Sequence, residues 1–162
     1  MIWHPATHIW RNRQNQALRP WLIAPGSLTK AIENHTQKSV TIKVLKQYFG
    51  IPTPSEQHYL GIKKSFALIR EVYLCIDNKP WIYARTIIPC QCLTGKFRRL
   101  KRWGKIAIGH FLFGNNGIKR GPIEIAYLSS ENVWARRSIF SKKNKKLLIT
   151  EVFLPAKWDK FS

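Results

Sequence analysis

Two stretches in the middle of the chain alternate apolar and polar residues, with a short turn sequence between them. Residues 68–76 and 81–88 both show this period of two, which is typical of half-buried β-strands. Asp77-Asn78-Lys79-Pro80 joins them, and this composition favours a tight reversal of the chain. The pattern predicts a β-hairpin, which commits this part of the chain to an antiparallel sheet.

Four further segments have the composition of strands. They lie at residues 39–45, 122–128, 133–140 and 147–154. Because the last three are joined by short turn sequences, most neighbouring strands are expected to pair as hairpins. The sequence therefore predicts six strands in one antiparallel sheet.

Short helices are expected before and between these strands. Ser27 or Thr29 is the candidate cap of a helix over residues 28–34. Residues 93–113 are predicted to form two short helical pieces, broken at Gly104.

The resulting fold class is α+β, with the helices on one side of the sheet. Residues 50–61 contain two prolines and are predicted to be a loop. The length of 162 residues is that of one domain, so we expect a single domain over residues 1–162.

The chain is strongly basic, with 28 Lys and Arg against 8 Asp and Glu and a formal net charge of +20. Basic residues concentrate between Lys96 and Lys105 and again at residues 142–146. Such a field attracts anions, whether nucleic acid, acidic lipid or small metabolites. No helix-turn-helix, zinc-finger or RNA-recognition pattern accompanies these runs, so we expect no specific nucleic-acid partner. A compositional bias toward Lys, Ile and Asn is the alternative explanation of the charge.

Metal and disulfide chemistry find little support in the sequence. Cys90 and Cys92 are too close together for a zinc hook, Cys75 is alone, and the five histidines lack ligand spacing. We therefore expect no metal and no disulfide, and reduced thiols fit a cytoplasmic location. Residues 1–20 lack the pattern of a signal peptide, and no apolar run approaches the ~20 residues of a membrane span.

Two arginines are expected to share an apolar face of the hairpin. Alternation places Arg70 with the apolar residues of its strand and Arg85 with those of the partner strand. A two-residue turn makes paired residue numbers sum to an odd value, which brings both guanidinium groups to the same face. Because like charges on an apolar face are costly unless an anion joins them, both are candidate anion ligands. Alternatively, one reaches solvent and the other pairs with a carboxylate such as Glu71.

The last predicted strand carries a carboxylate on its apolar side. Glu151 shares parity with its apolar neighbours, so it is expected to be either paired or functional. Its structural alternative is a cross-strand pair with Arg136. Glu124 is expected to pair in the same way with Arg137.

Seven motifs between residues 21 and 155 share their order and spacing with one known family. They are Trp21 with Gly26-Ser27-Leu28-Thr29, Arg70-Glu71-Val72-x-Leu74-Cys75, Pro80-Trp81-x-x-Ala84-Arg85-Thr86-x-x-Pro89, Leu93 with Gly104-Lys105-x-x-Ile108-Gly109-x-x-Leu112-Phe113, Ile123-Glu124-Ile125, Trp134-Ala135-Arg136-Arg137-Ser138, and Leu147-Leu148-x-Thr150-Glu151-x-Phe153-Leu154-Pro155. Together they resemble the chorismate lyase family, bacterial enzymes that start ubiquinone synthesis.

The resemblance implies a six-stranded antiparallel sheet whose helical flaps close over a buried ligand site. It also implies a reaction in which chorismate loses its enolpyruvyl group as pyruvate and the ring aromatises to 4-hydroxybenzoate. No metal or organic cofactor takes part in this family, so none is expected here. Because aromatisation drives the elimination, the protein mainly has to bind, desolvate and orient a dianion.

Five residues of the chain match functional positions of the family. Arg70 matches the arginine that holds the ring carboxylate, and Arg85 matches a second pocket arginine. Glu151 matches the glutamate that contacts the ligand hydroxyl. Leu28 and Ile108 match the two positions whose flap backbones line and close the site. All five are expected to bind substrate, and Arg70 and Glu151 are the expected catalytic residues.

Two features depart from the family pattern or leave other functions open. The chain has Ala107-Ile108-Gly109 where the family usually has Pro-Leu-Gly, and it is more basic than expected. A non-catalytic domain that binds small anions is one alternative, because effector domains of some transcription regulators look similar. A basic nucleic-acid-binding protein is another. Glu151 and the lack of a DNA-reading segment favour the lyase, which we expect to be a cytoplasmic monomer.

Overall fold

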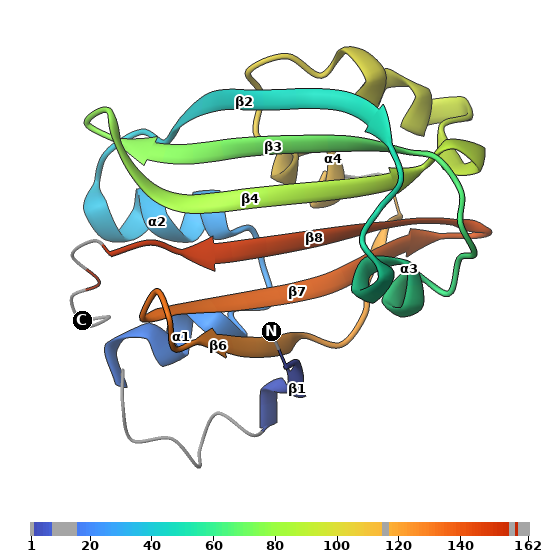
Figure 1. Ribbon diagram of the computed structural model, residues 1–162. Coiled ribbons are helices and arrows are strands. Elements are labelled where there is room, and N and C mark those ends of the chain that lie inside the picture. Colours follow the sequence, from blue (N-terminus) through green and yellow to red (C-terminus); the bar gives the residue numbers. More distant parts are fainter. Residues whose placement is uncertain (1, 8–15, 115–116, 156–157, 159–162) are drawn as a thin grey trace.

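An antiparallel sheet forms the centre of the molecule (Figure 1). The computed structural model describes residues 2–7, 16–114, 117–155 and 158. Its strands are β1 (His4–Pro5), β2 (Thr41–Gly50), β3 (Ala67–Ile76), β4 (Lys79–Pro89), β5 (Lys119–Arg120), β6 (Glu124–Leu128), β7 (Val133–Lys142) and β8 (Lys145–Phe153). They follow the order β1-β6-β7-β8-β4-β3-β2, with β5 paired to β7 outside this path.

The prediction of six strands was wrong by two: the described residues form an 8-stranded sheet. The additional strands are β1 and β5, which have two residues each. A two-residue strand shows no alternation, so the period-two pattern could not reveal either of them. The antiparallel pairing and the α+β class were predicted correctly.

Short helices connect and cover the strands. They are η2 (Gln16–Leu18), α1 (Arg19–Ile23), α2 (Leu28–Thr36), α3 (Pro54–Leu60), η3 (Cys90–Cys92), η4 (Gly95–Arg102) and α4 (Gly109–Leu112). Ser27 caps α2 as predicted, because its side chain accepts a hydrogen bond from the amide of Lys30. None of the helices in the described ranges is long and apolar enough to cross a bilayer.

The predicted loop at residues 50–61 was wrong over most of its length, because α3 forms there. Thr53 accepts a hydrogen bond from the amide of Glu56, whose carboxylate accepts one from the amide of Thr53. This reciprocal capping box satisfies two amides at the start of the helix, and Pro54 is tolerated in its first turn. Pro54, which was expected to prevent a helix, is therefore the first residue of one.

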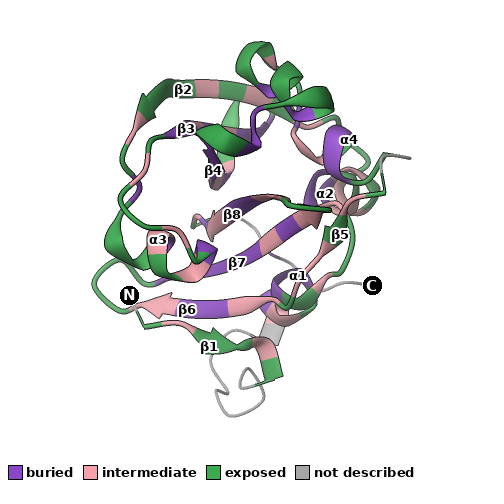
Figure 2. Cartoon of the chain, turned by 90° about the vertical axis from the view of Figure 1, so that its right-hand side faces the viewer, coloured by how far each residue is buried: buried purple, intermediate pink, exposed green. Residues whose placement is uncertain are grey.

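The two faces of the sheet have different covers (Figures 1 and 2). The inner face, which carries Arg70, packs one apolar cluster against α1 and α2 and a second against η3, η4 and α4. The outer face, which carries Arg85, packs a smaller cluster against α3. The expectation that all helices lie on one side was therefore wrong for α3. Each large apolar side chain that is fully buried in these clusters contributes about 1.5–3 kcal/mol to folding.

The β3–β4 hairpin contains one irregularity that decides which residues share a face. Its turn is Asp77-Asn78, both with positive φ, as a two-residue turn of the predicted kind requires. The register then shifts, because Cys75 pairs with Pro80 whereas Leu74 pairs with Ile82. Trp81 is therefore an extra residue in β4, and every later side chain of that strand changes face.

This bulge separates the two arginines of the hairpin. Arg70 lies opposite Thr86, and Arg85 lies opposite Glu71. The prediction that Arg70 and Arg85 share a face was wrong for this reason.

Candidate functional site

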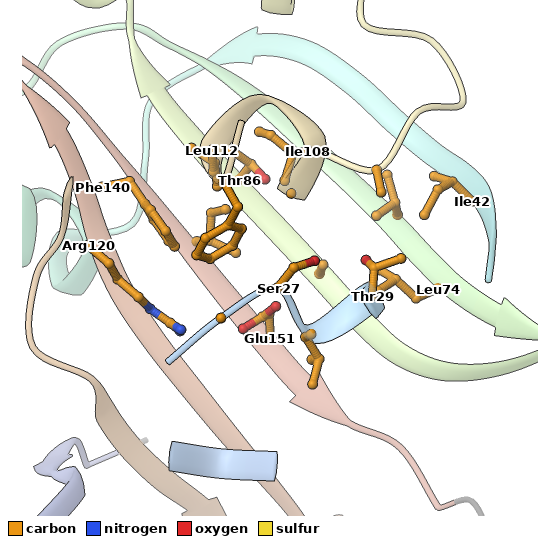
Figure 3. Close-up of a pocket in the computed structure, with 18 of the residues that line it drawn as sticks. Ser27, Thr29, Ile42, Leu74, Thr86, Ile108, Leu112, Arg120, Phe140 and Glu151 are labelled. Atoms are coloured by element: carbon orange, nitrogen blue, oxygen red, sulfur yellow. The ribbon is translucent and has the colours of Figure 1, made fainter. Parts of the chain in front are cut away.

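A pocket opens on the inner face of the sheet, where the two covers meet (Figure 3). Residues from the start of α2, from β2, β3, β4, β7 and β8, and from the segment around α4 line it. The cavity itself is small, about 40 Å³, within about 540 Å³ of empty space that includes its opening. The pocket is narrow and largely apolar, and its charged lining residues are Arg70, Arg120, Arg136 and Glu151.

Arg70 is a buried cation without a carboxylate partner in the described part of the chain. It is 3% exposed, and its Nη2 donates to the carbonyls of Gly104 at 2.7 Å and Ile106 at 3.3 Å. Its Nε is buried and has no hydrogen-bond partner among those residues. Burial lowers the pKa of Arg70, since the protein does not compensate its charge fully. A buried, unpaired guanidinium at a pocket wall favours the binding of an anion there.

Glu151 lines the same pocket and also pairs with Arg136. The Nε of Arg136 donates to Oε2 of Glu151 at 2.5 Å, and Arg136 is 1% exposed. Its Nη1 donates to the carbonyls of Trp21 and Ala24, which ties α1 to the sheet. The cross-strand pair that was set against a functional Glu151 is therefore present. It occupies one carboxylate oxygen, and the side chain still faces the pocket (Figure 3).

The second predicted carboxylate pair is confirmed. Glu124 lies opposite Arg137, and 2.7 Å separates Oε2 of Glu124 from Nη2 of Arg137. Neither residue lines the pocket, so this pair is structural.

Arg85 lies outside this pocket, apart from the other four residues that were predicted to bind substrate. On the outer face, its Nε is 2.7 Å from Oε1 of Glu56, and its Nη1 pairs with Glu71. Burial lowers the pKa of Arg85, but its hydrogen bonds to Glu56 and Tyr48 outweigh this effect, so the pKa lies above its ordinary value. Arg85 meets Glu71, as the alternative expected, but Arg70 does not reach solvent, because it is buried.

Arg120 is a pocket residue that the sequence analysis missed. Its Nε donates to Oγ of Ser138 at 2.7 Å, and its Nη1 donates to the carbonyls of Ala24 at 3.0 Å and Pro25 at 3.2 Å. Burial, with the nearby charge of Arg136, lowers the pKa of Arg120 to about 10. The strand that positions Arg120 has two residues, which is too short to show alternation. In the sequence, Arg120 therefore lies in what looks like a basic turn.

Two segments that approach each other cover the pocket. Leu28 at the start of α2 lies on one, and Ile108 before α4 lies on the other, and both residues line the pocket. A Cβ atom at Gly109 would stand 2.9 Å from Oγ of Ser27, so a side chain at this position would displace the hydroxyl that caps α2. The second segment is also held to Arg70 through the carbonyls of Gly104 and Ile106.

The remaining candidate groups do not assemble into a site. Cys75, Cys90 and Cys92 are all free thiols. No cluster of three or more His, Cys, Asp or Glu side chains with metal-binding geometry occurs within the ranges that the structure covers.

Known sequences that resemble this chain belong to one family of enzymes. The model of the chorismate lyase family matches residues 1–162. A probable chorismate pyruvate-lyase from Marinobacter nauticus is 37% identical over 142 residues, which are 85% of this chain and 76% of the relative. A chorismate pyruvate-lyase from Yersinia enterocolitica is 38% identical over 142 residues, 86% of this chain and 82% of the relative. A probable chorismate pyruvate-lyase from Pseudomonas putida is 30% identical over 170 residues, 99% of this chain and 93% of the relative.

Solved structures with the same fold include ligand-binding parts of transcription regulators. The effector domain of PhnF from Mycobacterium smegmatis superposes with a TM-score of 0.52 at 13% identity, over 83% of this chain and 91% of that one. A possible transcriptional regulator, YydK, from Bacillus subtilis superposes with a TM-score of 0.54 at 15% identity. That match covers 77% of this chain, and the chain spans 62% of the regulator's length. At such low identity the likeness concerns the fold alone.

Proposed function

The chain belongs to the chorismate lyase family, and we propose that it converts chorismate to 4-hydroxybenzoate and pyruvate in the pocket on the inner face of the sheet. In this reaction the bond between ring carbon 3 and the ether oxygen breaks, and the proton on carbon 4 leaves. The ring becomes aromatic as 4-hydroxybenzoate. The released enolpyruvate takes up a proton at its methylene carbon and becomes pyruvate.

The observation that carries the proposed site is the unpaired, buried guanidinium of Arg70. A guanidinium donates strong, charge-assisted hydrogen bonds to a carboxylate, and Arg70 keeps Nη1 available for this while Nη2 binds two carbonyls. We assign Arg70 to the ring carboxylate, which substrate and product share. Binding there restores the charge balance of a side chain that is 3% exposed.

Glu151 is assigned to the hydroxyl end of the ring. It stands one pleat along the sheet from the row that contains Arg70, because Ala84 pairs with Glu151 and Thr86 pairs with Ile149. Its Oε1 accepts no hydrogen bond from the residues that the structure describes, and is therefore available to the ring hydroxyl or to the proton on carbon 4. A carboxylate at this place orients the alcohol or accepts that proton, and its pair with Arg136 fixes its position.

The two covering segments exclude water from the reacting atoms. In our proposal the backbones around Leu28 and Ile108 close over the ring, and the contact between Ser27 and Gly109 defines the closed state. Exclusion of water strengthens the interactions of Arg70 and Glu151 with the substrate. Substrate entry and product release then require the two segments to separate.

We propose that the enzyme works as a single domain and as a monomer in the cytoplasm, without metal or organic cofactor. Every residue assigned to the site comes from one chain. Three free thiols are consistent with a reducing compartment. Aromatisation supplies the driving force, so binding and orientation by Arg70 and Glu151 suffice for the elimination.

Calorimetric titration with 4-hydroxybenzoate tests the assignment of Arg70. The R70A variant should bind about 10–150-fold more weakly, because a hydrogen bond to a charged group is worth roughly 1.5–3 kcal/mol. R70K should restore only part of this, since an ammonium cannot hold the two carbonyls and the carboxylate in the fixed planar arrangement of a guanidinium. R98Q removes an exposed arginine outside the pocket and serves as the control. Unchanged affinity in R70A would remove Arg70 from the site.

A further inference from the structure

Arg70 and Arg120 stand at the two ends of one row across the sheet. The register pairs Arg70 with Thr86, Thr86 with Ile149, and Ile149 with Ser138, and Arg120 binds the hydroxyl of Ser138. With roughly 4.8 Å between neighbouring strands, this row spans about 14 Å. The pocket thus has one arginine at each side of its floor.

Arg120 is fixed in place but retains hydrogen-bonding capacity toward the pocket. Its Nε and Nη1 are engaged by Ser138 and by the carbonyls of Ala24 and Pro25, and its guanidinium lies 5.3 Å from the centre of the Phe140 ring. Its Nη2 donates to no other described residue. Figure 3 shows the guanidinium end of Arg120 and the carboxylate of Glu151 pointing into the same space.

The charge of the pocket leaves Arg120 without an anionic partner of its own. The charged lining consists of three arginines and one glutamate, and Glu151 is already paired with Arg136. The described part of the chain offers Arg120 no carboxylate within ion-pair distance, as it offers none to Arg70. Two uncompensated cations in a mostly apolar pocket match a ligand with two negative charges.

We propose that Arg120 forms a second carboxylate subsite, which holds the carboxylate of the enolpyruvyl group while Arg70 holds that of the ring. This inference rests on the proposed function, because chorismate carries both carboxylates. The product 4-hydroxybenzoate carries only the first, so Arg120 contacts the substrate and the leaving group but not the product.

The subsite also acts on the bond that breaks. Cleavage of the carbon–oxygen bond moves negative charge onto the departing enolate, next to the carboxylate that Arg120 binds. A cation held rigidly at that position stabilises the developing charge more than it stabilises the ground state. Burial and the charge of Arg136 lower the pKa of Arg120, and the charge of Glu151 offsets this only in part, which is consistent with room for a further anion beside Arg120.

Two measurements on the same variants separate this role from a structural one. R120Q and R120K are compared with wild type for calorimetric affinity for 4-hydroxybenzoate and for kcat/KM with chorismate. We expect R120Q to lower kcat/KM about 10–150-fold, the worth of a lost charged hydrogen bond, and to bind 4-hydroxybenzoate as wild type does. R120K keeps the positive charge but lacks the planar guanidinium, so its kcat/KM should lie between those of wild type and R120Q. K119Q removes the neighbouring exposed charge outside the pocket and should match wild type in both measurements.

Other outcomes overturn the proposal in distinguishable ways. If R120Q and R120K lose affinity for 4-hydroxybenzoate in parallel with kcat/KM, Arg120 only maintains the shape of the pocket through Ala24 and Pro25. If neither quantity changes, Arg120 does not contact the substrate. Should R120Q fail to fold, as judged by thermal unfolding, R120K decides between these results. A wild-type protein that binds 4-hydroxybenzoate but does not act on chorismate overturns the proposed function itself.

Discussion

Arg85 of β4 lies directly across from Glu71 of β3, and the two side chains form an ion pair on the outer face of the sheet. Glu56 of α3 completes the cluster, with 2.7 Å between its Oε1 and Nε of Arg85. The side chains of Arg85 and Glu56 are only 17% and 10% exposed. One cation therefore neutralises two carboxylates that water reaches poorly, and it fastens α3 to the sheet.

R85Q should destabilise the protein without affecting ligand binding. The substitution leaves Glu56 and Glu71 close together and uncompensated, and breaking a largely buried pair costs about 3 kcal/mol. Urea unfolding measures this loss, and calorimetry of the folded protein should give an unchanged affinity for 4-hydroxybenzoate. A stable R85Q variant that binds ligand weakly would mean that Arg85 reaches the pocket and that the bulge at Trp81 is misplaced.

The same cluster predicts an acid dependence of stability. Burial alone would raise the pKa of Glu56, but hydrogen bonds from Arg85 and from the amide of Thr53 lower it below its ordinary 4.5. A lowered folded pKa gives stability that is complete above the ordinary value and is lost as the pH falls through the folded one. E56Q should therefore be less stable than wild type near neutral pH and should lose less stability below about pH 4.5. Unfolding curves with the same acid dependence in both proteins would contradict this.

E151Q separates the chemical role of Glu151 from its pair with Arg136. We expect lower stability, since Arg136 is buried without its counter-charge, and a rate per folded molecule that is about 10²–10⁴-fold lower. Binding of 4-hydroxybenzoate should persist within about one order of magnitude, because the amide still offers a hydrogen bond.

E124Q is the matched control for this experiment, because it breaks the analogous pair with Arg137 outside the pocket. It should lose stability and keep its rate. If E151Q behaves like E124Q, with full activity per folded molecule, Glu151 is structural only.

The basic runs predict weak, unspecific binding to nucleic acid. The basic residues of η4 are exposed, and none of the ion pairs in the described part of the chain involves them. Fluorescence anisotropy with DNA duplexes of unrelated sequence should give similar weak affinities that fall steeply with added salt. Tight binding to one sequence that persists at about 0.2 M salt would place the protein in another functional class.

Alternation along the strands predicted the sheet and both cross-strand carboxylate pairs, but it could not predict the bulge. Residues 81–88 keep a regular period of two, and a single inserted residue at Trp81 leaves no mark on that period. Arg70 and Glu151 were therefore placed on the correct face by parity, whereas Arg85 was placed on the wrong one. Arg120 was not predicted as a pocket residue for a different reason. Its position depends on the pairing of β5 with β7, which the local sequence does not reveal.

Turnover of chorismate by the purified protein is the decisive test of the proposed function. The protein is incubated with chorismate in the presence of a metal chelator, and 4-hydroxybenzoate and pyruvate are both quantified over time. We expect the two products to appear in equal amounts at a rate that the chelator does not change. Binding of chorismate without turnover, or activity that is lost in chelator and restored by metal, would contradict it.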